Sequence, residues 1–249
     1  ATTVNSSGKM IVSSDGSATS TTVDHGSMWV DGGSATATAV NSGGYMGIGN
    51  GGSATATTVN VGGRMMVGSG GSATSTTMNA GGTMWVDGGS TTSTTVNSGG
   101  VMTVYGHGSA TSTAVNSRGS ISIRSDGNAT STTMNAGGSM SVFLGGSATS
   151  TTVDSNGEMQ VYNGGSTTST TVNVGGFILV FSDGNATVTM VNSGGDMTVR
   201  SGGSATSTTV NAGGNMTIYV GESVTSTTVN AGGTINGFTF SEDRYFNSG

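Results

Sequence analysis

The sequence contains no cysteine and no proline, and only 7% of its 249 residues are charged. Without cysteine there is no disulfide framework, so the redox state of the compartment is not indicated, and the chain is suited to crossing a membrane unfolded. The six basic residues are never clustered and the formal net charge is −6, which argues against nucleic acid and anionic membrane as partners. We find no signal peptide pattern and no apolar run long enough for a transmembrane helix.

What the sequence has instead is a repeat, in which Ser-Ala-Thr-Ser-Thr-Thr is followed by an apolar anchor, Asn or Asp, and a Gly-containing corner. Successive anchors are 17 to 19 residues apart, and most are 19 apart. A fixed period of this length means that one structural unit is stacked many times. The 13 anchors are Val4, Val23, Val40, Val59, Met78, Val96, Val115, Met134, Val153, Val172, Val191, Val210 and Val229.

Each unit predicts short β-strands, because Thr and Val alternate in it and Gly pairs such as Gly43-Gly44 separate the stretches. The fold expected is all-β, a right-handed parallel β-helix (solenoid) of about 19 residues per turn and roughly 13 turns. Residues 1–235 form the repeat and begin within a turn, as in a piece of something longer, and residues 236–249 form an irregular cap or linker. The positions expected to point inward are Ala18, Thr21, Val23, Met28 and Val30, with their equivalents in every turn.

A second regular column holds methionine, which is flexible enough to fill an irregular axial core. Ile121, Ile178 and Ile235 take its place in three turns. We interpret the column as core and assign it no role in binding a cofactor or metal. Its members are Met10, Met28, Met46, Met65, Met84, Met102, Met140, Met159, Met197 and Met216.

Residues for catalysis are scarce. The two histidines, His25 and His107, lie several turns apart, and the adjacency of Asp24 and His25 in sequence does not make a catalytic relay. No zinc motif, calcium loop or phosphate loop occurs. The 12 acidic residues are scattered over many turns, whereas polysaccharide-cleaving β-helices need paired carboxylates in a cleft. We therefore expect a protein that is not an enzyme, with no catalytic residue, metal or bound cofactor.

Two sets of side chains predict an outward contact surface. Between the Met and Val positions stand Ile11, Trp29, Gly47, Met66, Trp85, Thr103, Ser122, Ser141, Gln160 and Leu179. After the Val position stand Tyr105, Arg124, Phe143, Tyr162, Phe181, Arg200 and Tyr219, which are expected to stack as one ladder. The possible contact surface comprises the second set together with Trp29, Met66 and Trp85. The alternatives are packing of the apolar cluster against flanking sequence and a ladder that only reinforces the sheet.

Serine hydroxyls form two further rows, and both are expected to face solvent. The first row lies two residues after the Ala position: Ser20, Ser75, Ser93, Ser112, Ser131, Ser150, Ser169, Ser207 and Ser226. The second row precedes the Ala position: Ser17, Ser34, Ser53, Ser72, Ser90, Ser109, Ser147, Ser166 and Ser204. A long rod with so few charges risks poor solubility, which sugar attached to such rows would relieve.

The reiterated Ser-Ala-Thr-Ser-Thr-Thr-Val-Asn-x-Gly-Gly phrase closely resembles the passenger repeats of self-associating autotransporter adhesins, over almost the whole chain to about Ile235. The resemblance implies a secretion leader upstream, the chain's own outer-membrane barrel downstream, and a passenger displayed on the bacterial cell surface. It also implies O-linked heptose, added to Ser in the cytoplasm by a dedicated heptosyltransferase. The implied functions are autoaggregation with identical passengers, biofilm formation, and adhesion to and invasion of host cells.

The resemblance makes the two serine rows candidate acceptors, with the first row as first choice, but it does not say which is used. Turns with Ala37, Ala56 or Val188 in the first row lack an acceptor there. Two other classes stay open. An ice-binding solenoid could use Thr-Ser-Thr columns, although the Ser points outward only at a corner. A polysaccharide-active β-helix enzyme ranks third.

Overall fold

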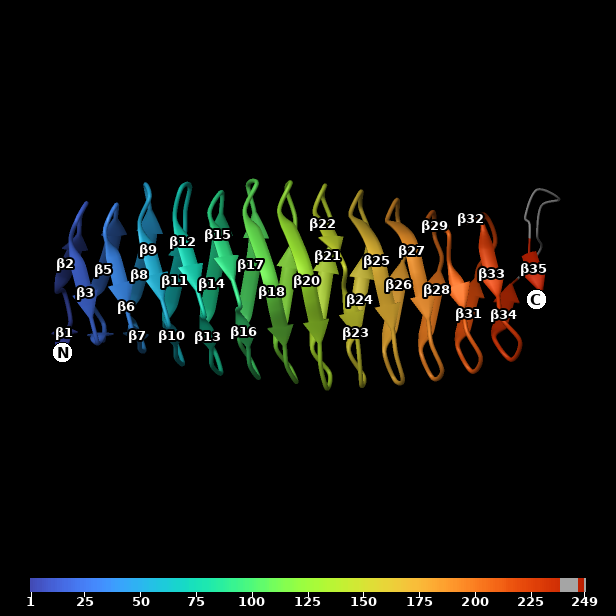
Figure 1. Ribbon diagram of the computed structural model, residues 1–249, viewed down its shortest axis with the longest axis horizontal. Helices are drawn as coiled ribbons and strands as arrows, with labels where there is room; N and C mark the ends of the chain where they lie inside the picture. Colours follow the sequence, from blue (N-terminus) through green and yellow to red (C-terminus); the bar gives the residue numbers. More distant parts are fainter. Residues whose placement is uncertain (238–245, 249) are drawn as a thin grey trace.

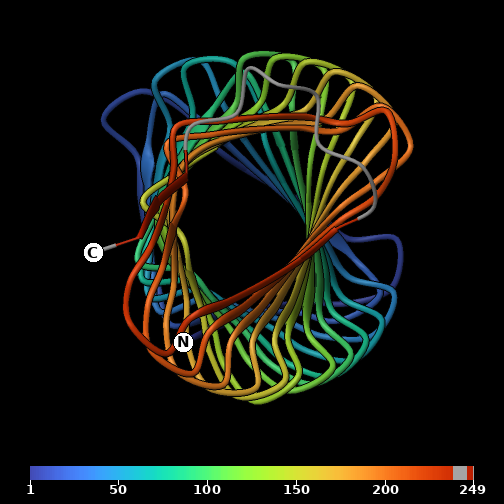
Figure 2. The same ribbon diagram turned by 90° about the vertical axis from the view of Figure 1, so that its right-hand side faces the viewer.

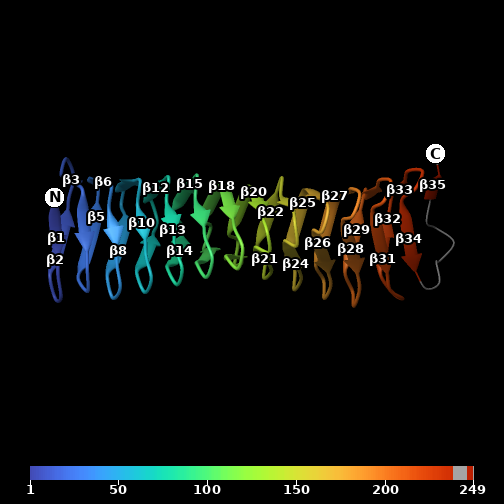
Figure 3. The ribbon, with the colours of Figure 1, turned by 90° about the horizontal axis from the view of Figure 1, so that it is seen from below.

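The computed structural model, which describes residues 1–237 and 246–248, is a rod wound as a parallel β-solenoid (Figures 1 and 3). Each coil takes about 19 residues, and the 13 anchors delimit about 12 complete turns. No helix occurs within the described residues. The expected solenoid is thereby confirmed.

Three strands per turn stack into three rows, which we call the first, second and third strand rows in chain order within a turn. The first row is β3 (Ser17–Thr19), β6 (Ser34–Thr36), β9 (Ser53–Thr55), β12 (Ser72–Thr74), β15 (Ser90–Thr92), β22 (Ser147–Thr149), β29 (Ser204–Thr206) and β32 (Ser223–Thr225). The second row is β1 (Thr2–Val4), β4 (Thr21–Val23), β7 (Ala39–Val40), β10 (Thr58–Val59), β13 (Thr77–Met78), β16 (Thr95–Val96), β23 (Thr152–Val153), β30 (Thr209–Val210), β33 (Thr227–Val229) and β35 (Phe246–Ser248). Four longer strands run through both rows: β18 (Ser109–Val115), β20 (Asn128–Met134), β25 (Ser166–Val172) and β27 (Asn185–Val191).

The third row forms a separate 13-stranded parallel sheet. Its strands are β2 (Lys9–Val12), β5 (Ser27–Asp31), β8 (Tyr45–Gly49), β11 (Arg64–Val67), β14 (Thr83–Asp87), β17 (Val101–Tyr105), β19 (Ser120–Ile123), β21 (Ser139–Val142), β24 (Glu158–Val161), β26 (Phe177–Val180), β28 (Asp196–Val199), β31 (Asn215–Ile218) and β34 (Thr234–Gly237). Figure 2 looks along the rod and shows that successive turns are rotated about its axis, as the natural twist of β-strands requires.

The core runs along the axis and is built from the inward columns. Ala18, Thr21, Val23, Met28 and Val30 are all buried, as expected. The register of the third row places one methionine directly over the next: Met84 pairs with Met102, which in turn pairs with Ile121. The column of apolar side chains in the interior is therefore confirmed.

Glycine at the corners is needed for close approach between turns as well as for positive φ. Gly71 does not have a positive φ, yet a Cβ atom there would lie 2.5 Å from the carbonyl oxygen of Ile48 in the preceding turn. A Cβ at Gly82 would lie 2.6 Å from the carbonyl oxygen of Val59. Real Cβ atoms essentially never come this close to a backbone oxygen, so the main chains of neighbouring turns pack in direct contact here.

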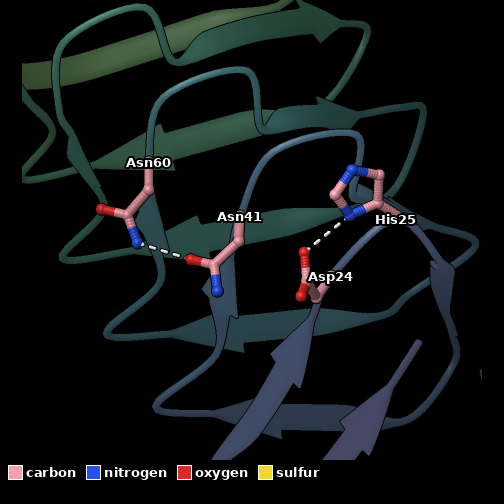
Figure 4. Close-up of polar contacts among 4 residues, drawn as sticks. All are labelled: Asp24, His25, Asn41 and Asn60. Atoms are coloured by element: carbon pink, nitrogen blue, oxygen red, sulfur yellow. Dashed lines mark hydrogen bonds and ion pairs between the residues drawn. The ribbon is translucent and has the colours of Figure 1, made fainter. Parts of the chain in front are cut away.

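A ladder of asparagine side chains stacks beside the anchor column, and it is the largest feature that the sequence reasoning did not predict. The amide nitrogen of one residue donates a hydrogen bond to the side-chain oxygen of its equivalent in the preceding turn, as Figure 4 shows for Asn60 and Asn41 at 2.9 Å. One run links Asn41 to Asn135, and a second links Asp154 to Asn230. The two runs are separate because a carboxylate at Asp154 has no N–H to donate to Asn135.

The C-terminal boundary was expected at residue 235. In the structure β34 continues to Gly237, where it still pairs with β31, and β35 pairs with β33. The rest of the expected cap, residues 238–245 and 249, lies outside the described residues. The division into a repeat and a cap remains a prediction.

We predict that Gly71→Ala lowers the free energy of unfolding by about 1–3 kcal/mol, because its Cβ forces the backbone of two turns apart. The matched control is Gly68→Ala in the same turn. Its Cβ would lie 3.6 Å from the same Ile48 oxygen, and its φ is not positive. That variant should keep or slightly raise the stability. Chemical denaturation of both variants measures the difference, and equal losses would contradict the contact.

We predict that Asn116→Ala destabilises the rod about twice as much as Asn135→Ala. Asn116 takes part in two ladder bonds, of 2.9 Å and 3.2 Å, whereas Asn135 takes part only in the second of them. Each bond contributes roughly 0.5–1.5 kcal/mol. The two residues are similarly half-buried, so denaturant titration of the pair isolates the hydrogen bonds. A larger loss for Asn135→Ala would be inconsistent with the ladder.

Candidate functional site

The first serine row lies at the corner between the first and second strand rows. From Ser20 to Ser226 every residue at this corner, in 12 successive turns, has φ between 53° and 58°, which is the left-handed region. All nine serines of the row are exposed, while the threonine that follows each one is buried. The corner thus turns the chain from one inward position to the next and leaves the serine outside.

The residue types at this corner are not those that the backbone conformation prefers. Gly adopts a left-handed φ without cost, and Asn and Asp adopt it more readily than other residues. At its other corners the chain has Gly at positive φ in many turns, for example Gly43 and Gly62, and other residues such as Asp126 and Ser182 in the rest. At this corner, however, it places Ser in nine turns, Ala at Ala37 and Ala56, and Val at Val188. Local backbone energetics therefore do not explain the serines.

The serine side chains of the row are also not occupied by structural hydrogen bonds. The backbone N–H groups are used, since Ser75 donates to the carbonyl oxygen of Thr92 at 3.0 Å and Ser150 donates to that of Thr168 at 2.9 Å. Within the part of the chain that the structure describes, the hydroxyls of the row bond to no other protein group. They are open to solvent and to chemistry from outside.

The second serine row lies on the first strands themselves and points away from the core, as expected. Ser17, Ser34, Ser53 and Ser90 are exposed. The remaining members are half-buried: Ser72, Ser109, Ser147, Ser166 and Ser204. The two rows therefore differ in access, because only the first is exposed in every turn that has a serine.

The outward positions between Met and Val lie on the outer face of the third strand row. Ile11 is 55% exposed and Trp29 is 42% exposed, whereas Met66 and Trp85 are half-buried. Leu179 differs from the expectation for this column, since only 7% of it is exposed. The apolar cluster of the N-terminal turns is thus present on the surface and is most open at its N-terminal end.

The column after the Val position stacks in two groups. The guanidinium carbon of Arg124 lies 4.8 Å from the centre of the Tyr105 ring. The rings of Phe143 and Tyr162 are 5.1 Å apart and nearly parallel at 4°, and Phe181 continues the stack 5.0 Å beyond Tyr162. Arg200 and Tyr219 complete the column and are exposed.

The surroundings of Tyr105 in the Tyr105–Arg124 pair change the pKa of its hydroxyl. Burial, followed by the negative charge of Asp87, raises the pKa of Tyr105, although the positive charge of Arg124 opposes the rise. The tyrosine is therefore neutral at physiological pH and acts here as a ring surface and a hydroxyl donor.

The Asp24–His25 pair lies at an exposed corner beside the asparagine ladder (Figure 4). The Nδ1 of His25 is 2.8 Å from the Oδ1 of Asp24, and both side chains are about half exposed. This contact joins two residues that are adjacent in sequence, and neither of its partners is a serine, threonine or cysteine nucleophile. Among residues 1–237 no cluster of His, Cys, Asp or Glu is arranged to hold a metal ion.

None of the elements that the structure describes is a helix of the length and apolarity that spanning a membrane requires. The ladder of asparagines and the small residues Gly49 and Gly68 on the outer face were missed by the sequence reasoning. The ladder could have been found, because Asn or Asp follows the anchor in all 13 units at the same period.

Comparison with known proteins adds family information to this geometry. A family described as "Adhesin of bacterial autotransporter system, probable stalk" matches residues 26–82, 135–176 and 180–233, which together are more than half of the chain. No curated protein matches significantly. A solved structure of TibC-catalysed hyper-glycosylated TibA, residues 55–350, is 44% identical. It aligns with 99% of this chain and 89% of its own at a TM-score of 0.90. The chain belongs to the adhesins of bacterial autotransporter systems and is a passenger of that family related to TibA.

Proposed function

We propose that this passenger is an O-glycosylated adhesin of the bacterial surface, modified with heptose on the first serine row before export. A cytoplasmic heptosyltransferase would be its modifying partner. The modified rods would mediate autoaggregation, biofilm formation, and adhesion to and invasion of host cells. The solved TibA fragment supports the proposal, because it is similar along nearly the whole chain and is described as glycosylated by TibC.

The observation that carries the choice of row is the left-handed serine corner. Holding a residue other than Gly in this region costs of order 1 kcal/mol, and the chain meets that cost in every turn. An exposed serine whose hydroxyl has no structural hydrogen-bond partner is available as an acceptor, which gives a reason to keep serine there. The second row needs no such explanation, because serine on an exposed strand carries no backbone cost.

In the transfer reaction the chain itself has to supply only a serine hydroxyl. The Oγ of a row serine would attack the anomeric carbon of a nucleotide-activated heptose, its proton would pass to a base of the transferase, and the nucleoside diphosphate would leave. Neighbouring acceptors lie about 4.8 Å apart, because they sit on adjacent strands. Sugars at that spacing crowd one another, so we expect incomplete occupancy along the row.

The twist of the rod separates this proposal from ice binding. An ice-binding face must match a flat lattice over many turns, whereas Figure 2 shows each face turning progressively about the axis. A row of flexible sugars has no such requirement. The outer cluster around Trp29 and the rows of sugars would then present two kinds of contact to neighbouring rods and to other cells.

We predict that Val188→Ser adds one glycan to the passenger when the transferase is co-expressed. Val188 occupies the first row at φ 56°, between Ser169 and Ser207. The matched control is Asn185→Ser, which places serine in the second row of the same strand, in register with Ser166 and Ser204. Intact-mass measurement should show a gain for Val188→Ser and none for Asn185→Ser. The reverse result would assign the modification to the second row.

We predict that replacing the nine first-row serines by alanine abolishes transferase-dependent aggregation of cells that display the passenger. Alanine already occupies this corner at Ala37 and Ala56, so the solenoid should persist. Circular dichroism checks the fold and the settling of cell suspensions measures aggregation. Equal aggregation with and without the transferase in the unaltered passenger would contradict the role given to the sugars. Ice recrystallisation inhibited by unmodified protein would favour the rival function.

A further inference from the structure

The outer face of the third strand row carries a hollow within the Trp29 cluster, and the proposed function assigns no ligand to it. It has a volume of about 340 Å³ and lies across β5, β8 and β11, with Trp29, Tyr45 and Met66 around it. Known small-molecule sites have volumes of roughly 300–1,000 Å³, so the hollow is at the low end of that range. It opens to solvent, and its size suits a single ring of a larger molecule.

Two glycines form part of the hollow without any structural need for glycine. A Cβ at Gly49 would meet only the Ser69 carbonyl oxygen at 3.9 Å, and a Cβ at Gly68 only the Ile48 carbonyl oxygen at 3.6 Å. Neither glycine has a positive φ. The same column carries Asp31, Asp87 and Tyr105 in other turns, so side chains fit the position. What the two glycines achieve is an open surface.

Two aromatic side chains are held in place at the hollow. Gly47 lets Trp29 lie down over the strand, since a Cβ at Gly47 would be 2.6 Å from Cε3 of the indole. The Tyr45 ring lies 5.2 Å from the Trp29 ring at 51°, and the Tyr45 hydroxyl donates to the sulfur of Met66 at 3.5 Å. Trp29 still exposes 42% of its surface. The indole is thus positioned and left available for a ligand.

The lining of the hollow is mainly apolar, and it includes three polar side chains whose charges balance. Lys9 provides an ammonium group, Asp31 a carboxylate and Asn50 an amide. A purely apolar ligand would remove water from these groups without offering them hydrogen bonds, which is unfavourable. A charged ligand would be repelled by either Lys9 or Asp31. A neutral ligand with an apolar face and a hydroxylated edge matches both the indole and the polar groups.

We propose that this hollow is a binding site for a neutral pyranose ring, whose C–H face packs on Trp29 and whose hydroxyls bond to Lys9, Asp31 and Asn50. The inference rests on the proposed function only where it names the heptose of a neighbouring passenger as a possible source of the sugar. A glycan on another cell and the heptose of a neighbouring passenger present the same ring chemistry. Binding itself is measured on unmodified protein, so failed glycosylation would not affect that measurement.

The test is saturation-transfer NMR of unmodified protein with neutral methyl pyranosides, namely the glucoside, galactoside, mannoside and N-acetylglucosaminide. We expect transfer to at least one of them, and binding about tenfold weaker or lost in Trp29→Ala. Gly49→Val should have the same effect, because it fills the hollow at a position with room for a side chain. Trp85→Ala is the matched control, since Trp85 stands in the same column, one strand beyond Met66, and does not line the hollow; this variant should bind like the unaltered protein.

Three results would overturn the proposal: no transfer to any pyranoside, equal transfer in all four proteins, or Trp29-dependent self-association of unmodified protein without sugar binding. The last would assign the hollow to a second copy of the chain. If pyranoside binding is found, adding glycosylated passenger to isotope-labelled unmodified protein identifies the source. A shift of the Trp29 indole N–H points to the neighbour's heptose, and its absence points to glycans of other cells.

Discussion

Each turn of this solenoid lies on the main chain of the turn before it, and at the corners a glycine lies directly against a carbonyl group of the preceding turn. At Gly71 and Gly82 there is no room for a Cβ above the oxygens of Ile48 and Val59. The contact fixes where each corner sits on its neighbour, and the strand registers of all three rows follow from it. The regularity of the rod is therefore a property of its backbone packing as much as of its core.

Once the register is fixed, every side chain meets its own equivalent in the next turn. Identical neighbours suit some residue types much better than others. Asparagine can both donate to and accept from another asparagine, so it forms ladders, and aromatic rings stack, as Phe143 and Tyr162 do. Charged residues would repel their equivalents at this spacing. The low charge of the sequence is a consequence of the architecture, and attached sugar is one way in which such a surface stays soluble.

The sequence was sufficient to predict the solenoid and its interior, because apolar residues that repeat once per turn line up along the rod and form its core. Apolar residues recur at the positions of Ala18, Val23 and Met28, and in every turn these positions face the core. The corner at Ser20 was placed on the surface correctly, but its left-handed φ was not foreseen, since residue preferences favour Gly or Asn there. The hollow beside Trp29 depends on how an indole lies over Gly47, and periodicity carries no information about side-chain orientation.

The asparagine ladder also gives the rod an electrical direction. In each run the amide nitrogens point toward the N-terminal end and the oxygens toward the C-terminal end, so the side-chain dipoles add along the axis. Asp154 stands at the nitrogen end of the second run and accepts from Asn173 at 2.6 Å. Its negative charge thus lies where the aligned dipoles are positive, much as an acidic residue does at the start of an α-helix.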